Sequence, residues 1–391
     1  MSALRASRCI EFHSTDPAPG KFRQAGTSTA RPRCSAPGYL LASVLSGVIS
    51  LAVSSGSSAQ AVAVQADETW IVSDRSLPVP AHASPELASA IAGAPQPDPQ
   101  APGPYPQTEA DWLAMQQAAR SGDSPLPVLE QSLGLEIQSA DRAGVTVYEI
   151  TPGEIADQHR DHVFLHLHGG GYVLGGGPGA AGEAAQISAA AGIRAVSVDY
   201  RMPPEFPFPA AVDDAIAVYR DLLEDYAPGE IAIGGTSAGA GLSFAAILQM
   251  KNLGLPVPGA VFAGTPWADL TDTSDSLYTM AGIDRILVSY DGLLKTGATL
   301  YADGEDLTNP LISPLYGDFS GFPPTILISG TRDMLLSDTA RAHRQLLDAG
   351  VEADLHVFEG MSHAEYMIMP GIPEGRMTWM AISDFLKVHL D

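Results

Sequence analysis

The chain has 391 residues, of which 45% are hydrophobic and 17% are charged, and its formal net charge at pH 7 is −24. This composition excludes an intrinsically disordered chain, which would carry fewer apolar and more charged residues. The acidic balance disfavours a nucleic-acid partner, because phosphate binding requires clustered Lys and Arg side chains. Two cysteines are too few for a disulfide framework or a cysteine-based zinc site.

Residues 1–61 differ from the rest of the chain, because they hold six basic and two acidic side chains. Within them, 39–53 is an uncharged run of 15 apolar or small residues, shorter than the about 20 that a membrane span needs. Small residues follow in the pattern Ala59-Gln60-Ala61, and the order basic, apolar, small is typical of a secretory signal. We therefore expect export to the periplasm or the medium after cleavage behind Ala61, with no stable membrane span left.

An N-terminal tail with a chance apolar run is the alternative, and it would leave the protein in the cytoplasm. The 38 residues before the apolar run are long for the basic N-terminal region of a signal, so either translation starts downstream of Met1 or the extension is real. Cleavage would remove both Cys9 and Cys34. The remaining chain would then carry 15 basic and 43 acidic side chains, a net charge of −28. Such a charge aids solubility and would suit a salty medium.

Residues 62–107 are rich in alanine and proline, which predicts an extended linker or a wrapping arm. The next segment, 108–121, is predicted to be a helix. Thr108 can cap its N-terminus, and Trp112 and Met115 fall on one face at helical spacing.

From about residue 135 onward, short apolar runs alternate with patterns of helical period. Strands are expected at 145–150, 163–167, 193–198, 230–234, 260–263, 325–329 and 353–358. Helices are expected at 180–191, 210–226, 238–252, 337–349 and 374–390. Strands that alternate with helices predict an α/β fold, in which helices cover both faces of a mostly parallel sheet.

The segment Gly235-Thr236-Ser237-Ala238-Gly239 follows a predicted strand and opens a predicted helix. This is the context of a G-x-S-x-G nucleophile elbow, in which a tight turn lifts the serine hydroxyl clear of the sheet. Ser237 is therefore the candidate nucleophile. The backbone N–H of Ala238 lies at the helix N-terminus, where partial positive charge favours an oxyanion. A plain glycine-rich turn is the alternative.

A second glycine run, His168-Gly169-Gly170-Gly171, directly follows the strand predicted at 163–167. Consecutive glycines let backbone N–H groups approach the oxygen of a tetrahedral intermediate, although a glycine hinge has the same composition. Residues 175–177 are also glycines, but they lack the G-x-G-x-x-G spacing of a dinucleotide loop, and no Walker lysine follows. No cofactor is expected.

A serine nucleophile needs a base and an orienting carboxylate, which follow an elbow serine in the order Ser, Asp, His. Asp333 comes just after one late strand, and His363 comes just after the next. Both loops belong at the edge of the sheet that carries Ser237, so Ser237, Asp333 and His363 form the predicted catalytic triad. His166 and His168 could suggest a metal, but no third ligand is apparent and no metal is expected.

Together these motifs resemble the bacterial hormone-sensitive-lipase-like esterases, family IV of the α/β-hydrolase superfamily, in the subgroup with a GTSAG motif. The resemblance covers about residues 108–391. Phe206, where the family usually has histidine, and Ala240, where glycine is common, depart from the pattern without touching the triad. The motifs stand in the right order: HGGGY (168–172), DYRMPPEFPFPAA (199–211), GTSAG (235–239), TPWADLT (265–271), NPLISPLYGD (309–318), GTRDMLLSD (330–338) and GMSHAEY (360–366).

The resemblance implies an α/β-hydrolase sheet of about eight strands and a helical cap, built from about residues 67–135 and an insertion at about 268–310. The chain would divide into three parts: the signal segment 1–61, the Pro-rich arm with the N-terminal cap helices 62–135, and the catalytic domain 136–391.

The resemblance also implies that the backbones of Gly170, Gly171 and Ala238 donate to the oxyanion. Tyr172, next to that loop, is a candidate for substrate binding, and simple packing is its alternative. Homodimers are common in the family.

We therefore expect a serine carboxylesterase that hydrolyses short-to-medium acyl esters through an acyl-enzyme intermediate, with a small-molecule ester as its partner. A lactone or other cyclic-ester hydrolase would use the same triad. A non-catalytic ligand-binding module is a third alternative. The plant gibberellin receptors are such modules, but they have lost the catalytic histidine, whereas His363 is present here.

Overall fold

The computed structural model describes residues 63–64, 70–71, 76–100, 105–120 and 124–391, and the signal predicted at 1–61 lies outside these residues. The chain forms two compact units, Met1–Arg75 and Ser76–Asp391. In the first unit, β1 (Ala63–Val64) pairs in antiparallel orientation with β2 (Trp70–Ile71). All elements below belong to the second unit. No helix in the described ranges is long and apolar enough to cross a membrane.

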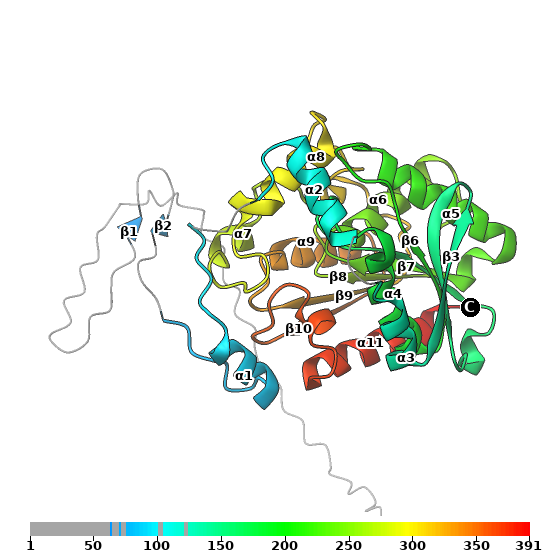
Figure 1. Ribbon diagram of the computed structural model, residues 1–391, viewed down its shortest axis with the longest axis horizontal. Coiled ribbons are helices and arrows are strands. Elements are labelled where there is room, and N and C mark those ends of the chain that lie inside the picture. Colours follow the sequence, from blue (N-terminus) through cyan, green and yellow to red (C-terminus); the bar gives the residue numbers. More distant parts are fainter. Residues whose placement is uncertain (1–62, 65–69, 72–75, 101–104, 121–123) are drawn as a thin grey trace, which may run out of the picture. The chain divides into compact units, whose positions relative to one another are not determined.

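An eight-stranded sheet forms the centre of the second unit (Figure 1). The strand order is β10-β9-β8-β7-β5-β6-β4-β3, and neighbours are parallel except for β3 with β4 and β4 with β6. The predicted α/β fold with about eight mostly parallel strands is confirmed. The strands are β3 (Leu135–Arg142), β4 (Val145–Pro152), β5 (Val163–Leu167), β6 (Arg194–Val198), β7 (Ile231–Thr236), β8 (Ala260–Gly264), β9 (Thr325–Gly330) and β10 (Ala353–Phe358).

The edge strand β3 is the one strand of this sheet that the sequence pattern did not predict. Only Leu135 and Ile137 of β3 are buried, and its second half is polar. It therefore lacks the continuous apolar run of the central strands, which are buried on both faces. Ala143 and Gly144 join β3 to β4 with φ angles of +53° and +83°, the left-handed conformation of a tight two-residue hairpin.

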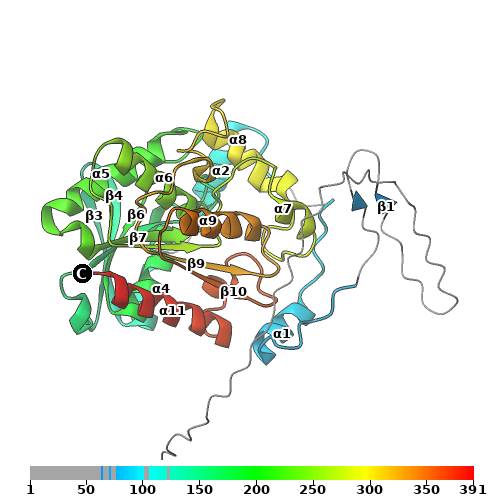
Figure 2. The same ribbon diagram turned by 180° about the vertical axis from the view of Figure 1, so that it is seen from behind.

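Helices cover both faces of the sheet (Figures 1 and 2). Each face has its own cluster of buried apolar residues. One face carries α3 (Leu126–Leu133), α4 (Ala181–Ala191) and α11 (Pro373–His389). The other carries α5 (Ala210–Asp225), α6 (Ala238–Asn252) and α9 (Leu336–Asp348). Apart from α3, these helices match the predicted ranges to within one residue at either end.

A group of helical segments lies in the two ranges from which the resemblance predicts a cap. It contains α2 (Glu109–Arg120), α7 (Asp275–Thr279), the short π-helical segment η4 (Tyr290–Leu294) and α8 (Lys295–Ala302). Both ribbon views show α2 beside α8 (Figures 1 and 2). The Tyr105 hydroxyl donates to the carbonyl of Asp291 at 3.0 Å, which ties the chain before α2 to the 268–310 insertion. Gln116 of α2 donates to the carbonyl of Val173, just beyond the HGGG loop, at 2.7 Å.

The helix α1 (Pro85–Gly93) packs elsewhere, against α11. The N–H and the hydroxyl of Ser84 both donate to the carboxylate of Glu374, each at 2.7 Å. Leu87 is fully buried in the apolar cluster that α4 and α11 share. This part of the Pro-rich arm therefore packs against the helices α4 and α11.

Candidate active site

Ser237 occupies a sharp turn between β7, which ends at Thr236, and α6, which begins at Ala238. Its φ of +62° and ψ of −122° belong to a region that residues other than glycine rarely adopt. A Cβ on Gly235 would lie 1.9 Å from the carbonyl oxygen of Leu167, so no side chain fits beside the turn. The Ser237 N–H donates to the carbonyl of Gly264 at 2.8 Å. The turn therefore has the geometry of a nucleophile elbow.

The glycine loop after β5 lies beside this elbow. Gly170 and Gly171 have φ angles of +113° and +64°, and a Cβ on Gly170 would lie 2.2 Å from the carbonyl oxygen of Leu174. His168 supports the loop, because its Nδ1–H donates to the carbonyl of Gly169 at 2.8 Å and its ring stacks on Tyr200 at 3.9 Å. Burial lowers the pKa of His168 to about 3, so it is neutral at physiological pH.

Asp333 and His363 come from the loops after β9 and β10, and they are in direct contact. Nδ1 of His363 lies 3.1 Å from Oδ1 of Asp333, which also accepts the N–H of Leu335 at 2.9 Å. The second carboxylate oxygen accepts the hydroxyl of Ser329 at 2.7 Å. Burial opposes ionisation of His363, but the charge and hydrogen bond of Asp333 outweigh it, so the pKa of His363 is raised.

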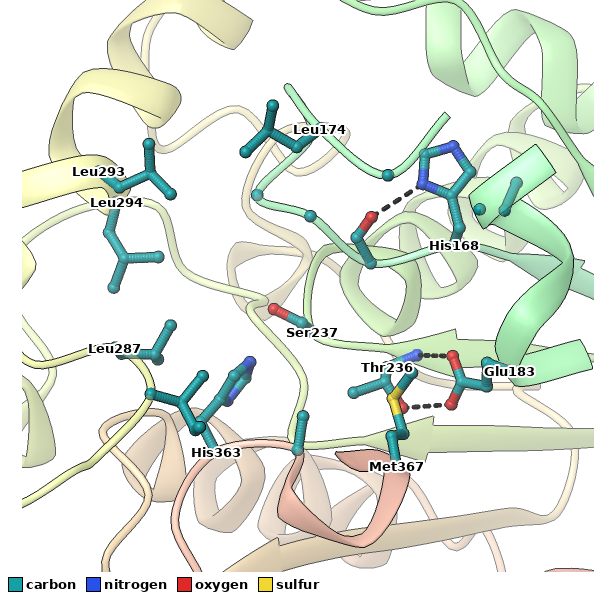
Figure 3. A pocket seen from close by; sticks show the side chains of 18 of the residues that line it. His168, Leu174, Glu183, Thr236, Ser237, Leu287, Leu293, Leu294, His363 and Met367 are labelled. Atoms are coloured by element: carbon teal, nitrogen blue, oxygen red, sulfur yellow. Dashed lines mark hydrogen bonds between the residues drawn. The ribbon is translucent and has the colours of Figure 1, made fainter. Parts of the chain in front are cut away.

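These segments meet at a pocket of about 450 Å³, which Ser237, His363 and the glycines 169–171 line. Figure 3 shows Ser237 and His363 facing each other. Both residues are described by the structure, and their side chains are not hydrogen-bonded to each other. Such bonds often tighten only when substrate binds. On one side of Ser237 lie Leu287, Leu293 and Leu294, and on the other lie Glu183, Thr236 and Met367 (Figure 3).

Comparison with known proteins identifies the family. A family model described as alpha/beta hydrolase fold matches residues 164–367. An acetyl-hydrolase of Streptomyces hygroscopicus is 36% identical over 245 residues, which are 62% of this chain and 81% of the relative. The crystal structure of an esterase E25 has 42% identity and a TM-score of 0.79, and the match covers 83% of this chain and 99% of that one.

The crystal structure of an esterase from the bacterial hormone-sensitive lipase family has 33% identity and a TM-score of 0.64, and the match covers 79% of this chain and 99% of that one. The chain belongs to the hormone-sensitive-lipase-like esterases of the α/β-hydrolase fold. The resemblance drawn from the sequence motifs is thereby confirmed, and the non-catalytic module is set aside.

Ser237 and His363 of the predicted triad line one pocket, with Asp333 buried against His363, but Tyr172 lies elsewhere. Tyr172 is 1% exposed and lies outside the pocket lining, behind the glycine loop. Its hydroxyl donates to the carbonyl of Trp267 at 3.1 Å, and its ring stacks on Tyr301 at 4.3 Å. The structure therefore favours the packing alternative for Tyr172 over substrate binding, because its ring is buried among core side chains and its backbone has a φ of +64°.

The His-x-His pair of β5 has two separate sets of contacts. His168 supports the glycine loop, whereas His166 contacts the carboxylate of Glu183 at 3.0 Å and the hydroxyl of Ser197 at 2.8 Å. Within the described ranges, no group of three or more His, Cys, Asp and Glu side chains is arranged to hold a metal ion.

Asp284 is a residue near the triad that sequence reasoning missed. It is fully buried and accepts the N–H of Met334, the residue after Asp333, at 2.9 Å. Its other oxygen accepts the N–H groups of Ile286 and Leu287 at 2.8 and 3.2 Å, and burial raises its pKa. Asp284 thus joins the pocket wall of the insertion to the loop of the catalytic acid. It occurs in a segment without periodicity or motif, so no sequence signal could have found it.

Proposed function

We propose that this esterase hydrolyses short-to-medium acyl esters through an acyl-enzyme on Ser237, with His363 as general base and Asp333 as the orienting acid. One observation carries the proposal. The elbow, the glycine loop and the Asp333–His363 pair come from the ends of four parallel strands, and Ser237, His363 and the glycines of the loop line a single pocket.

In this mechanism, His363 takes the hydroxyl proton of Ser237 as the serine oxygen attacks the ester carbonyl. Asp333 accepts the Nδ1–H of His363, which leaves Nε2 available for the transfer and stabilises the imidazolium that forms. The backbone N–H groups of Gly170, Gly171 and Ala238 donate to the oxyanion. His363 then protonates the departing alcohol, and a water molecule that it activates releases the acid from Ser237.

The size and lining of the pocket support the substrate range. Its volume of about 450 Å³ falls in the range of small-molecule sites, roughly 300–1,000 Å³. Leucines of the insertion and Met367 provide apolar walls for an acyl chain or an alcohol group of limited length. The acetyl-hydrolase name of a relative is in keeping with a short acyl group.

The test of the nucleophile is Ser237→Ala, assayed with p-nitrophenyl butyrate. Loss of a triad serine lowers kcat by about 10⁶-fold in a serine hydrolase, and we expect a loss of that order without a change in the unfolding midpoint. Ser243→Ala is the matched control. Ser243 is a buried serine of α6, the helix that begins after Ser237, and its hydroxyl donates to the carbonyl of Gly239. Undiminished turnover by Ser237→Ala would overturn the assignment.

The acyl range is tested by a series of p-nitrophenyl esters from acetate to palmitate, with a panel of lactones beside it. We expect kcat/KM to be highest among the short and medium esters and to fall for long chains, which exceed the pocket. A maximum at palmitate, or a preference for lactones, would contradict the substrate range and leave the nucleophile assignment intact.

We further propose that the esterase is exported and loses residues 1–61. The order of basic, apolar and small residues supports this. The homodimer that the family resemblance implies stays a prediction, which sedimentation of the full chain would test.

A further inference from the structure

A buried polar cluster lies beneath the elbow and takes no part in the mechanism above. None of its five members is more than 3% exposed. They come from five different elements: His166 of β5, Glu183 of α4, Ser197 of β6, Thr236 of β7 and Tyr366 of the short helix α10 (Glu365–Ile368). Glu183 and Thr236 also border the pocket, next to Ser237 (Figure 3).

Thr236 is the centre of this cluster. Its N–H donates to Oε2 of Glu183 at 3.1 Å, and its hydroxyl donates to Oε1 of the same carboxylate. The hydroxyl oxygens of Thr236 and Tyr366 are 2.5 Å apart. Because the single hydroxyl proton of Thr236 goes to Glu183, Tyr366 must donate to Thr236. Two side chains from distant parts of the chain therefore hold the residue that precedes the nucleophile.

The contact between His166 and Glu183 explains how the Glu183 carboxylate can remain buried. The Ser197 hydroxyl donates to the carbonyl of Ala180 at 2.8 Å, so it accepts the Nδ1–H of His166 at 2.8 Å. Nε2 of His166 lies 3.0 Å from Oε2 of Glu183, where a lone pair would repel a carboxylate. One proton therefore occupies this contact, and the pair is neutral as a whole. A neutral pair avoids the cost of an isolated buried charge.

Thr236 also contacts the other catalytic segments. A Cβ on Gly169 would lie 2.9 Å from the carbonyl oxygen of Thr236, so the glycine loop packs directly on this peptide. Tyr366 follows His363 by three residues, so its hydroxyl connects the histidine loop to the elbow. Thr236 is thus in contact with the oxyanion loop on one side and the histidine loop on the other.

We propose that Glu183 and Tyr366 are positioning residues, which act through Thr236 to hold Ser237 in register with His363 and the oxyanion loop. This rests on the proposed role of Ser237 as nucleophile. His166 supports the arrangement by keeping the Glu183 carboxylate neutralised and oriented.

Two variants of the full chain test the proposal, Thr236→Val and Tyr366→Phe. Each removes one hydroxyl and keeps the shape of the side chain. Misplacement of reacting groups by 1 Å can cost about 10²-fold in rate, so we expect kcat per active site to fall by at least about tenfold with KM within about twofold. Thr236→Ser, which keeps the hydroxyl, should restore kcat. Active sites are counted by titration with a p-nitrophenyl phosphonate.

Matched controls separate positioning from stability. Thr378→Val removes a buried threonine hydroxyl that donates to the carbonyl of Glu374, and Tyr219→Phe removes a buried tyrosine hydroxyl that donates to the carbonyl of Pro256. Both hydrogen bonds lie outside the pocket lining. We expect the controls to lower the unfolding midpoint and to leave kcat per active site unchanged.

The proposal is overturned if kcat per active site in Tyr366→Phe stays within twofold of the wild type, or if the controls lose as much kcat. If Thr236→Val does not fold, kcat per active site of Tyr366→Phe alone tests the proposal. The double variant of Thr236→Val and Tyr366→Phe should lose no more kcat than the more damaged single variant, because both changes remove the same hydrogen bond. Phosphonate labelling that persists in Ser237→Ala would refute the nucleophile assignment instead, independently of these variants.

Discussion

At the scale of single residues, the backbone of Ser237 is the most constrained feature of the site. A residue held at such φ and ψ values carries a cost of order 1–3 kcal/mol, which the surrounding structure must offset. The Ser237 N–H donates to Gly264, and its carbonyl accepts the N–H groups of Gly241 at 3.1 Å and Trp267 at 3.0 Å. Three backbone hydrogen bonds therefore hold the main chain of Ser237 in this conformation before any substrate arrives.

The Asp333–His363 pair gives a prediction about pH. Asp333, with a smaller contribution from Asp284, raises the pKa of His363 above its ordinary 6.5. The base works only when it is neutral, so kcat/KM should rise with pH and level off above 6.5. In Asp333→Asn, burial still lowers the pKa of His363 while the main opposing charge is gone. We expect the acid limb to move to lower pH and kcat to fall by about 10⁴-fold.

The pH dependence of kcat/KM for both proteins is the measurement. Asp384→Asn, which removes an exposed carboxylate of α11, is the control and should leave the profile unchanged. An acid limb at the same pH in wild type and Asp333→Asn would contradict the prediction.

At the scale of elements, the site depends on loops that rigid strands place at one edge of the sheet. The loops after β5, β7, β9 and β10 supply the glycine run, Ser237, Asp333 and His363. Their strands are parallel, so their carboxyl ends lie at the same edge, and ligands bind at this edge in open α/β sheets.

The glycine loop gives a prediction at this scale. In Gly170→Ala, the new Cβ would lie 2.2 Å from the carbonyl oxygen of Leu174 at a φ of +113°, so the loop must move. Loss of one oxyanion donor costs about 10²–10³-fold in kcat, and we expect a loss of this size. Gly182→Ala in α4 is the control, because its Cβ meets nothing within 4 Å. Full activity of Gly170→Ala in steady-state assays would refute the role of this loop.

The start of α9 gives a prediction about stability. Asp338 is fully buried and accepts the N–H groups of Ala268 and Asp269 at 3.0 and 2.9 Å, and burial raises its pKa from 3.8 to about 7. Between these values the folded state keeps a proton that the unfolded state loses. The resulting stability is full below about pH 4 and is lost as the pH rises to about 7.

The asparagine of Asp338→Asn cannot ionise, so the stability of this variant should not fall between about pH 4 and about pH 7. Urea unfolding at pH 5, 6, 7 and 8 measures the difference. We expect the free energy of unfolding of the wild type to fall relative to the variant by up to about 1.4 kcal/mol per pH unit up to pH 7 and then to stay level. A difference that is independent of pH would show that Asp338 does not titrate in this range.

At the scale of the whole molecule, segments far apart in the chain secure the catalytic domain from both sides. The helix α2 contacts the insertion and the backbone just beyond the glycine loop, whereas α1 is fastened to α11 through Ser84 and Glu374. The part of the chain between Ser76 and Asp391 is therefore one compact unit, although its N-terminal portion is rich in proline.

Export is the prediction at this scale. In a bacterial host that expresses the full chain, we expect the protein outside the cytoplasm to begin at Val62, as N-terminal sequencing and intact mass would show. Ala61→Arg should block processing, because the cleavage site requires small residues. Protein that begins at Met1 and stays in the cytoplasm would contradict the signal.

The sequence by itself determined six of the helices, seven of the eight strands of the main sheet and the identity of the triad candidates, because each is encoded by local periodicity or by a short motif. Only the tertiary structure decided which side chains meet. Tyr172 stands beside the glycine loop in sequence, but it packs in the core behind that loop. Glu183 and Tyr366 lie 53 and 130 residues from Thr236 along the chain, and no local pattern encodes a contact over such separations. Folding of the sheet and its helices brings these residues together beneath Ser237.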